Sequence, residues 1–113
     1  MPSRDWTIRI QDIRKAASKI IEHTKDMEFD AFARDEWLQD AVLRNLTIIG
    51  EAVILIPEDI VKNLPDVPVR YIKGLRNNIV HAYFRIEPRI VWDTIQDELP
   101  KMLAALDKIS GIN

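Results

Sequence analysis

Residues 38–57 read LQDAVLRNLTIIGEAVILIP, a run in which apolar side chains recur every three or four positions. This spacing predicts a long helix that ends where Ile56 meets Pro57, because the residue before a proline is driven out of the helical region. The apolar run 52–56 could be mistaken for a buried strand, but it continues the helical phase and no other run could pair with it. The face is formed by Leu38, Val42, Leu46, Ile49, Val53 and Ile56.

The same helix has a second apolar side. It is formed by Leu43, Thr47, Gly50 and Ile54. A helix that is apolar nearly all round is buried all round. Either this helix is central in the monomer, or a partner chain covers its second side, with Gly50 allowing a close approach. Asn45 falls among the apolar positions, and because a buried amide needs partners, we expect it to order a polar group nearby.

Further helices are expected on both sides of this run. An apolar stripe predicts a helix over residues 4–25, and a short helix is expected over 57–63. Pro68 suits the first turn of a helix over 68–83, and Pro88 opens a last helix that reaches nearly to the end, with a kink at Pro100. The pattern predicts an all-α, four-helix up-down bundle with short extra helices.

Length and composition narrow the possible classes of protein. The 113 residues, 47% of them apolar, indicate one folded domain over residues 1–113. The lack of cysteine excludes a disulfide framework, an iron–sulfur cluster, a Cys-ligated zinc and a thiol nucleophile. No run approaches the ~18 apolar residues that span a membrane, so we expect a cytoplasmic protein. The two histidines lack a zinc-site spacing, and neither a metal nor another cofactor is expected.

Charge is unevenly distributed along the chain. The net charge of −2 gives no long-range attraction for a polyanion, so a nucleic-acid role would need a local basic patch. The window 69–89 offers one, although such a window is also typical of an ordinary solvated face. Its basic residues are Arg70, Lys73, Arg76, Arg85 and Arg89, against Glu87 as the acid.

A regular helix over 68–83 divides its residues into two faces. The apolar face is expected to hold Val69, Tyr71, Ile72, Leu75, Ile79 and Ala82. The opposite face holds Arg70, Lys73, Gly74, Asn77, Asn78 and His81. Arg76 lies at the boundary, where its stem can rest on the core while its guanidinium points outward.

Arg76 and His81 together suggest phosphodiester chemistry. Histidine can pass a proton to or from a ribose 2′-hydroxyl or a leaving oxygen, and arginine clamps a phosphate and offsets its developing charge. One histidine cannot easily act as both acid and base, so a two-fold dimer that brings two copies of His81 to one cleft would supply the pair. By spacing alone, an isolated histidine near an arginine is more often a structural or surface residue.

The run Arg76-Asn77-Asn78-Ile79-Val80-His81-Ala82-Tyr83 resembles the signature of the HEPN superfamily, specifically the HepT-like toxins of prokaryotic toxin–antitoxin pairs. The segment 44–52, RNLTIIGEA, resembles the family's second helix segment, although Thr47 stands where an acidic residue is common. Val91-Trp92-Asp93-Thr94 resembles its last-helix segment.

The resemblance implies a toxin that is a metal-independent endoribonuclease, with Arg76 and His81 catalytic in a cleft across a homodimer. Asn77 would bind RNA or orient the histidine. The implied partner is a minimal nucleotidyltransferase antitoxin that can transfer AMP to the motif tyrosine, here Tyr83; a core aromatic is the alternative for that residue. The supporting residues are expected to be Lys73, Arg70, Asn45 and Glu51, with Glu51 pairing with Arg76 or Arg44. The competing interpretation is a catalytically inactive bundle that binds or presents a substrate to a nucleotidyltransferase.

Overall fold

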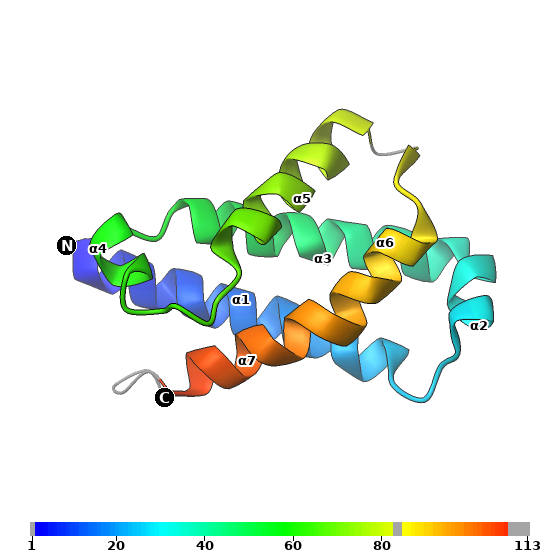
Figure 1. The fold of residues 1–113 in the computed structure, drawn as a ribbon, viewed down its shortest axis with the longest axis horizontal. Helices are drawn as coiled ribbons and strands as arrows, with labels where there is room; N and C mark the ends of the chain where they lie inside the picture. Colours follow the sequence, from blue (N-terminus) through cyan, green and yellow to red (C-terminus); the bar gives the residue numbers. More distant parts are fainter. Residues whose placement is uncertain (1, 83–84, 109–113) are drawn as a thin grey trace.

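The structure is a computed structural model that describes residues 2–82 and 85–108, with side chains from Trp6 onward in these ranges. Four long helical segments run alternately up and down the molecule (Figure 1). The elements are α1 (Pro2–Thr24), α2 (Phe29–Arg34), α3 (Glu36–Ile54), α4 (Glu58–Val61), α5 (Val69–Ala82), α6 (Pro88–Asp93), the π-helical turn η2 (Thr94–Glu98) and α7 (Leu99–Asp107). The described residues contain no strand, and the predicted all-α bundle is confirmed.

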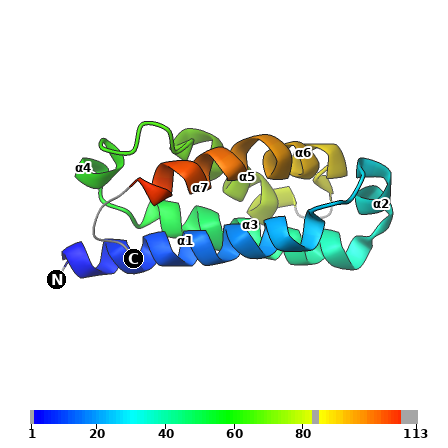
Figure 2. The same cartoon turned by 90° about the horizontal axis from the view of Figure 1, so that it is seen from below.

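The bundle has two sides. Figure 2 shows α1 and α3 side by side, with the continuous segment α6–η2–α7 passing over them. Helix α5 packs against α3 and leans away from the bundle, so that its C-terminal end projects beyond its neighbours in Figure 1. None of the described helices is both long and apolar enough to span a membrane.

One apolar core joins all the long helices. The predicted face is buried from Val42 onward, and so is Leu43 on the second side of α3. Gly50, also on the second side, lies directly against α5, so a helix of the same chain covers much of that side. Ile54, at the end of α3, keeps 43% of its surface exposed. The second apolar side is therefore explained mainly by the central position of α3 within the monomer.

Local sequence signals set the helix boundaries. Asp26 adopts a left-handed backbone conformation, with φ of 66°, directly after α1 ends. The side chain of Asp35 accepts a hydrogen bond of 3.0 Å from the backbone N–H of Leu38, which caps the start of α3. Pro57 precedes α4, and Pro88 is the first residue of α6. The predicted helices therefore agree with the structure to within a few residues.

Helix α2 was not predicted from the sequence. It has six residues, too few to show a clear helical period. Tertiary contacts hold it: Phe32 is fully buried, and its ring centroid lies 5.3 Å from that of Trp92. The side-chain amide of Gln39 donates to the carbonyl of Phe32 at 2.8 Å.

The distortion expected at Pro100 lies one turn earlier than predicted. Proline has no N–H, and its ring clashes with the carbonyl four residues before it. The chain relieves this clash by widening into the π-helical turn η2, which ends at Glu98, just before α7 begins.

Candidate active site

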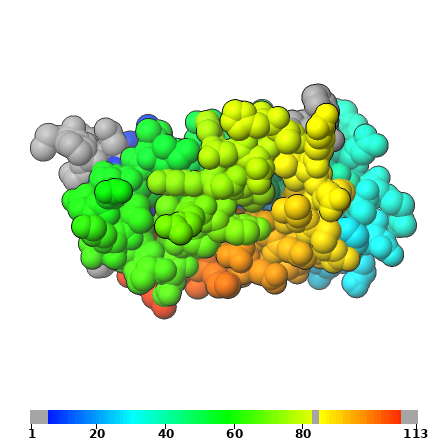
Figure 3. All heavy atoms as spheres, turned by 45° about the horizontal axis from the view of Figure 1, so that its top comes forward, coloured from blue at the N-terminus to red at the C-terminus, as the bar shows by residue number. Residues whose placement is uncertain are grey.

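Helix α5 carries most of the predicted site residues on one side. Ile72, Leu75 and Ile79 are buried in the core. The opposite side is open to solvent over Arg70, Lys73, Asn77 and His81, in agreement with the predicted division into two faces except at Tyr71. Figure 3 shows the side chains of α5 across the middle of an open face of the molecule.

Arg76 is seated on Gly50. A Cβ atom added to Gly50 would lie 2.6 Å from Cγ of Arg76 and closer still to its Cβ, so only glycine allows α3 and α5 to approach this closely here. The stem of Arg76 is therefore fixed against α3, as its boundary position predicts. Its side chain remains 26% exposed, so the guanidinium reaches the surface.

Two neighbours orient the Arg76 guanidinium. Its Nη1 donates to Oδ1 of Asn77 at 3.1 Å, and its Nη2 lies 3.7 Å from Oε1 of Glu51. Glu51 thus pairs with Arg76, one of its two expected partners. Because the Glu51 side chain is 56% exposed, this ion pair contributes little to stability and acts mainly on orientation.

Nε of Arg76 is buried and has no hydrogen-bond partner among the described residues. An unpaired buried donor costs about 1–3 kcal/mol, so the position of Arg76 against Gly50 lowers the stability of the fold. A buried donor without a partner in a folded protein is one sign of a functional side chain. The geometry suits an arginine whose outer nitrogens act on a ligand.

His81 is exposed in the last turn of α5 and makes no hydrogen bond to other described residues. Its ring can therefore reach a ligand. It lies five positions after Arg76, which corresponds to about 7.5 Å along the helix axis and about 140° around it. The two side chains of one α5 thus leave the helix in different directions.

The structure does not bring Asn45 to this face. Its Nδ2 donates to the carbonyl of Ala41 at 2.9 Å, and its side chain lines a groove between α1 and α3 with Lys19 and His23. The expected need of its amide is thus met within α3. His23 is exposed, and its Nδ1 donates to the carbonyl of Lys19 at 2.9 Å, as suits a surface residue at a helix end. Tyr83 lies outside the described residues.

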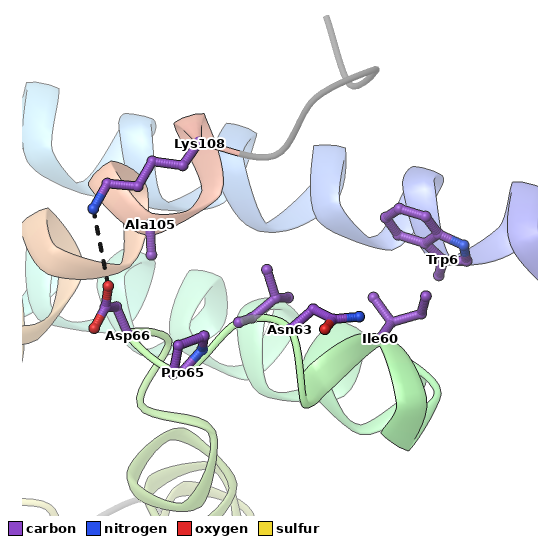
Figure 4. A pocket seen from close by; sticks show the side chains of 8 residues that line it. Trp6, Ile60, Asn63, Pro65, Asp66, Ala105 and Lys108 are labelled. Atoms are coloured by element: carbon purple, nitrogen blue, oxygen red, sulfur yellow. Dashed lines mark ion pairs between the residues drawn. The ribbon is translucent and has the colours of Figure 1, made fainter.

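A cavity of about 540 Å³ lies elsewhere, at the end of the bundle where α1 begins and α7 ends (Figure 4). Its walls are largely apolar, and at its rim Nζ of Lys108 lies 3.9 Å from Oδ2 of Asp66. It is lined by Trp6, Ile60, Asn63, Leu64, Pro65, Asp66, Ala105 and Lys108. It contains none of the motif residues on α5, and the candidate active site is therefore an open face, not this cavity.

The described residues bring no three His, Asp or Glu side chains together in a way that could hold a metal ion. Asp93 and Asp97, one helical turn apart, are both exposed. They are surface residues.

Two features of the site were not predicted. Gly50 lies on the side of α3 for which a partner chain and a central place in the monomer were both possible, and it packs directly against Arg76 of the same chain. Tyr71 was assigned to the apolar face, yet 41% of its surface is exposed and its hydroxyl lies 2.6 Å from Oγ1 of Thr94. Tyr71 is partly exposed because it lies at the edge of that face, where its hydroxyl binds Thr94 in η2 while part of the ring stays in water.

An all-helical bundle whose exposed third long helix carries an arginine and a histidine with four residues between them has the features expected of a protein of the HEPN class. The comparisons with known proteins identify the family within that class. The model of the family described as "Ribonuclease HepT-like" matches residues 13–109, and the chain belongs to this family of ribonucleases.

Two named relatives support this assignment. "Putative RNase MJ0127" of Methanocaldococcus jannaschii is 38% identical over 109 residues, which cover 96% of this chain and 90% of the relative. "Probable ribonuclease HepT" of Thermococcus cleftensis is 35% identical over 100 residues, which cover 88% of this chain and 91% of the relative. No solved structure matches the chain.

Proposed function

We propose that this ribonuclease is the toxin of a toxin–antitoxin pair and cuts RNA internally without a metal ion, using Arg76 and His81. The observation that carries the proposal is the contrast on α5 between a firmly seated Arg76 and an exposed His81 that makes no hydrogen bond to other described residues. A seated guanidinium gives a fixed positive charge, and a free imidazole can transfer protons.

The chemistry needs one base and one acid. His81 of one subunit takes the proton of a ribose 2′-hydroxyl, whose oxygen then attacks the neighbouring phosphorus. The bond from phosphorus to the 5′-oxygen breaks, and that oxygen takes a proton from a second imidazole. The products are a 2′,3′-cyclic phosphate and a free 5′-hydroxyl. Arg76 stabilises the negative charge that builds up on the phosphate oxygens.

A homodimer would provide both groups at one phosphate. Within one chain, Arg76 and His81 leave α5 about 140° apart, so a single copy does not readily close around one phosphate. A second copy placed across α5 would add its own His81 and Arg76 to the same cleft. Val80, beside His81 in the sequence, is 50% exposed, and Ile54 at the end of α3 is 43% exposed. These apolar side chains are suited to such an interface.

The basic side chains Arg70 and Lys73 would hold the RNA backbone, since both are exposed on the same side of α5. Asn77 and Glu51 would keep the guanidinium of Arg76 in place through the contacts described above. Asn45 contributes no contact to this face in the monomer.

The direct test is cleavage of a single-stranded RNA by the purified protein in EDTA. His81→Ala and Arg76→Ala should lower the rate at least about 100-fold, because each removes a group that acts in the transition state. The matched control is His23→Ala, which removes the other histidine of the chain from an exposed position on α1. It should cut like the wild type. Undiminished cutting by His81→Ala would refute the proposed mechanism.

We further propose that a nucleotidyltransferase antitoxin neutralises this toxin by transferring AMP to Tyr83. The tyrosine hydroxyl would attack the α-phosphorus of ATP, lose its proton and release pyrophosphate. Tyr83 follows His81 by two residues in the sequence, so the added phosphate would bring negative charge close to the RNA site and repel the substrate.

Mass spectrometry tests this modification. Incubation with the nucleotidyltransferase and ATP should add AMP-sized mass increments to the wild-type chain and stop RNA cleavage. Tyr83→Phe should gain no such mass and should keep cutting. Modification of the Tyr83→Phe variant at the wild-type level would assign the acceptor to another residue.

The net charge of −2 favours a second candidate, a bundle that binds the nucleotidyltransferase or its substrate without catalysis. The cleavage assay separates the two. If the wild-type protein forms a complex with the nucleotidyltransferase but cuts no RNA, the binding role is correct and the toxin role is wrong.

A further inference from the structure

Tyr71 on α5 is an anchored but partly exposed aromatic ring. Its hydroxyl lies 2.6 Å from Oγ1 of Thr94, and that oxygen also lies 2.9 Å from the carbonyl of Ile90. The carbonyl can only accept, so Thr94 donates to Ile90 and Tyr71 donates to Thr94. Thr94 is fully buried, whereas 41% of Tyr71 is exposed. The ring is thus fixed at its hydroxyl end and open to solvent elsewhere.

Gly74 leaves the space beside this ring empty. Residues three apart are neighbours on a helix surface, and a helical side chain leans over the turn before it. A side chain at position 74 would therefore lie over Tyr71. A Cβ added to Gly74 would meet no atom within 4 Å, so the glycine is not required for packing.

The neighbours of Tyr71 on α5 itself favour an anion. Arg70 and Lys73, its near neighbours on α5, are both exposed. Tyr71, Gly74, Asn78 and His81 follow each other at helical spacing along one side of α5. His81 lies ten positions after Tyr71, which corresponds to about 15 Å along the helix axis.

Trp37 provides a contrast. It is 88% exposed at the start of α3 and is therefore more accessible than Tyr71. However, its neighbours in the sequence include Asp35, Glu36 and Asp40, whose negative charges repel a phosphate backbone. Exposure alone does not make an aromatic ring suitable for a nucleic acid; the charge around it must also be positive.

We infer that Tyr71 is a stacking subsite for one base of a single-stranded RNA, a few nucleotides away from the bond that is cut at His81. The inference rests on the proposed ribonuclease function and adds to it a contact outside the catalytic residues. Proteins commonly bind single-stranded RNA by combining a basic surface with aromatic side chains on which bases stack. Because stacking tolerates every base, the subsite selects for the length of the RNA more than for its sequence.

Binding can be measured without cleavage by using fluorescently labelled RNAs with 2′-O-methyl groups, which remove the attacking hydroxyl. An RNA of about eight nucleotides is long enough to extend from His81 past Tyr71 on either side of the cut bond. We expect Tyr71→Ala to weaken binding of this RNA about 5- to 100-fold, as is usual for the loss of one stacked base. A dinucleotide should bind equally to both proteins, while Tyr71→Phe should keep most of the affinity.

Substitutions at Gly74 test the same contact with Tyr71 left intact. Gly74→Leu should cover the ring and weaken binding of the longer RNA as Tyr71→Ala does, whereas Gly74→Ala should bind like the wild type. Tyr71→Ala also removes the hydrogen bond to Thr94 and can therefore lose stability. In that case the comparison of Gly74→Leu with Gly74→Ala still tests the stacking contact, because both variants keep Tyr71. Trp37→Ala, which removes a more exposed ring in acidic surroundings, should have no effect.

Two outcomes would overturn the inference. One is unchanged binding of the longer RNA by both Tyr71→Ala and Gly74→Leu; the other is an equal loss of binding in Trp37→Ala. If either occurs while the wild-type protein cuts RNA in EDTA, the stacking subsite is wrong and the ribonuclease function stands. If the wild-type protein neither binds nor cuts RNA, both are wrong.

Discussion

The contact between Gly50 and Arg76 shows how one residue supports the site. Gly50→Ala places a methyl group 2.6 Å from Cγ of Arg76, next to atoms that the backbone of α5 holds in place. We expect overpacking to destabilise the protein by about 1–3 kcal/mol. This should exceed the gain of about 1 kcal/mol from placing alanine in a helix. RNA cleavage should also fall, because Arg76 must move.

Gly74→Ala is the matched control for this prediction. It makes the same substitution in a helix where nothing lies within 4 Å, so it should raise stability by up to about 1 kcal/mol. Urea unfolding of both variants measures the difference. Equal stability of the two variants would show that Gly50 does not seat Arg76.

The sequence predicts the place of a single residue correctly where that place depends only on the helical period. The boundary position of Arg76 follows from counting residues along α5, and so does the exposure of His81. The seat on Gly50 could not be predicted, because it depends on which residues of two helices meet. Asn45 shows the same limit: its place in the apolar stripe is visible, but the groove it lines and the carbonyl it binds are not.

At the scale of elements, α2 is the least self-sufficient helix. Six residues cannot form a stable helix alone, so α2 depends on tertiary contacts. Phe32 is the buried residue of α2 and packs beside Trp92. We expect Phe32→Ala to reduce the free energy of unfolding by about 3–5 kcal/mol and to release α2 from α6.

Phe29→Ala is the comparison for this prediction. Phe29 is only half-buried, its ring lies 6.2 Å from that of Trp92, and the Arg89 guanidinium is 3.8 Å from its centroid. Its loss should cost clearly less stability than the loss of Phe32. Hydrogen exchange over residues 29–34 would show whether α2 opens, and a larger effect from Phe29→Ala would contradict the assignment of Phe32 as the anchor.

The long helices were predictable because each carries a sustained apolar period and an identifiable start or stop. Pro57, Pro68 and Pro88 mark boundaries that the structure places within a residue or two. Helix α2 and the turn η2 were not predictable. Helix α2 is too short to show a helical period. The turn η2 relieves the steric clash caused by Pro100, and the chain could have relieved that clash by bending at another position.

At the scale of the whole molecule, the account requires two copies. Val80, 50% exposed next to His81, lies where the second copy is proposed to pack. Val80→Asp should leave the melting temperature nearly unchanged, since the side chain is exposed, but it should give a monomer that no longer cuts RNA. Leu55→Asp, at a 57% exposed apolar residue beyond the end of α3, should remain dimeric and active. Sedimentation velocity separates the two results, and an active Val80→Asp monomer would contradict the shared cleft.

The most direct test of the shared cleft is to mix wild-type chains with His81→Ala chains, allow subunits to exchange, and measure RNA cleavage in EDTA. If both imidazoles act at one cleft, only wild-type pairs cut, so activity follows the square of the wild-type fraction. An equal mixture then keeps about a quarter of the activity. If each chain cuts by itself, the same mixture keeps about half. A shared cleft therefore leaves a quarter of the activity in this mixture, and a measured half would show that each chain cuts alone.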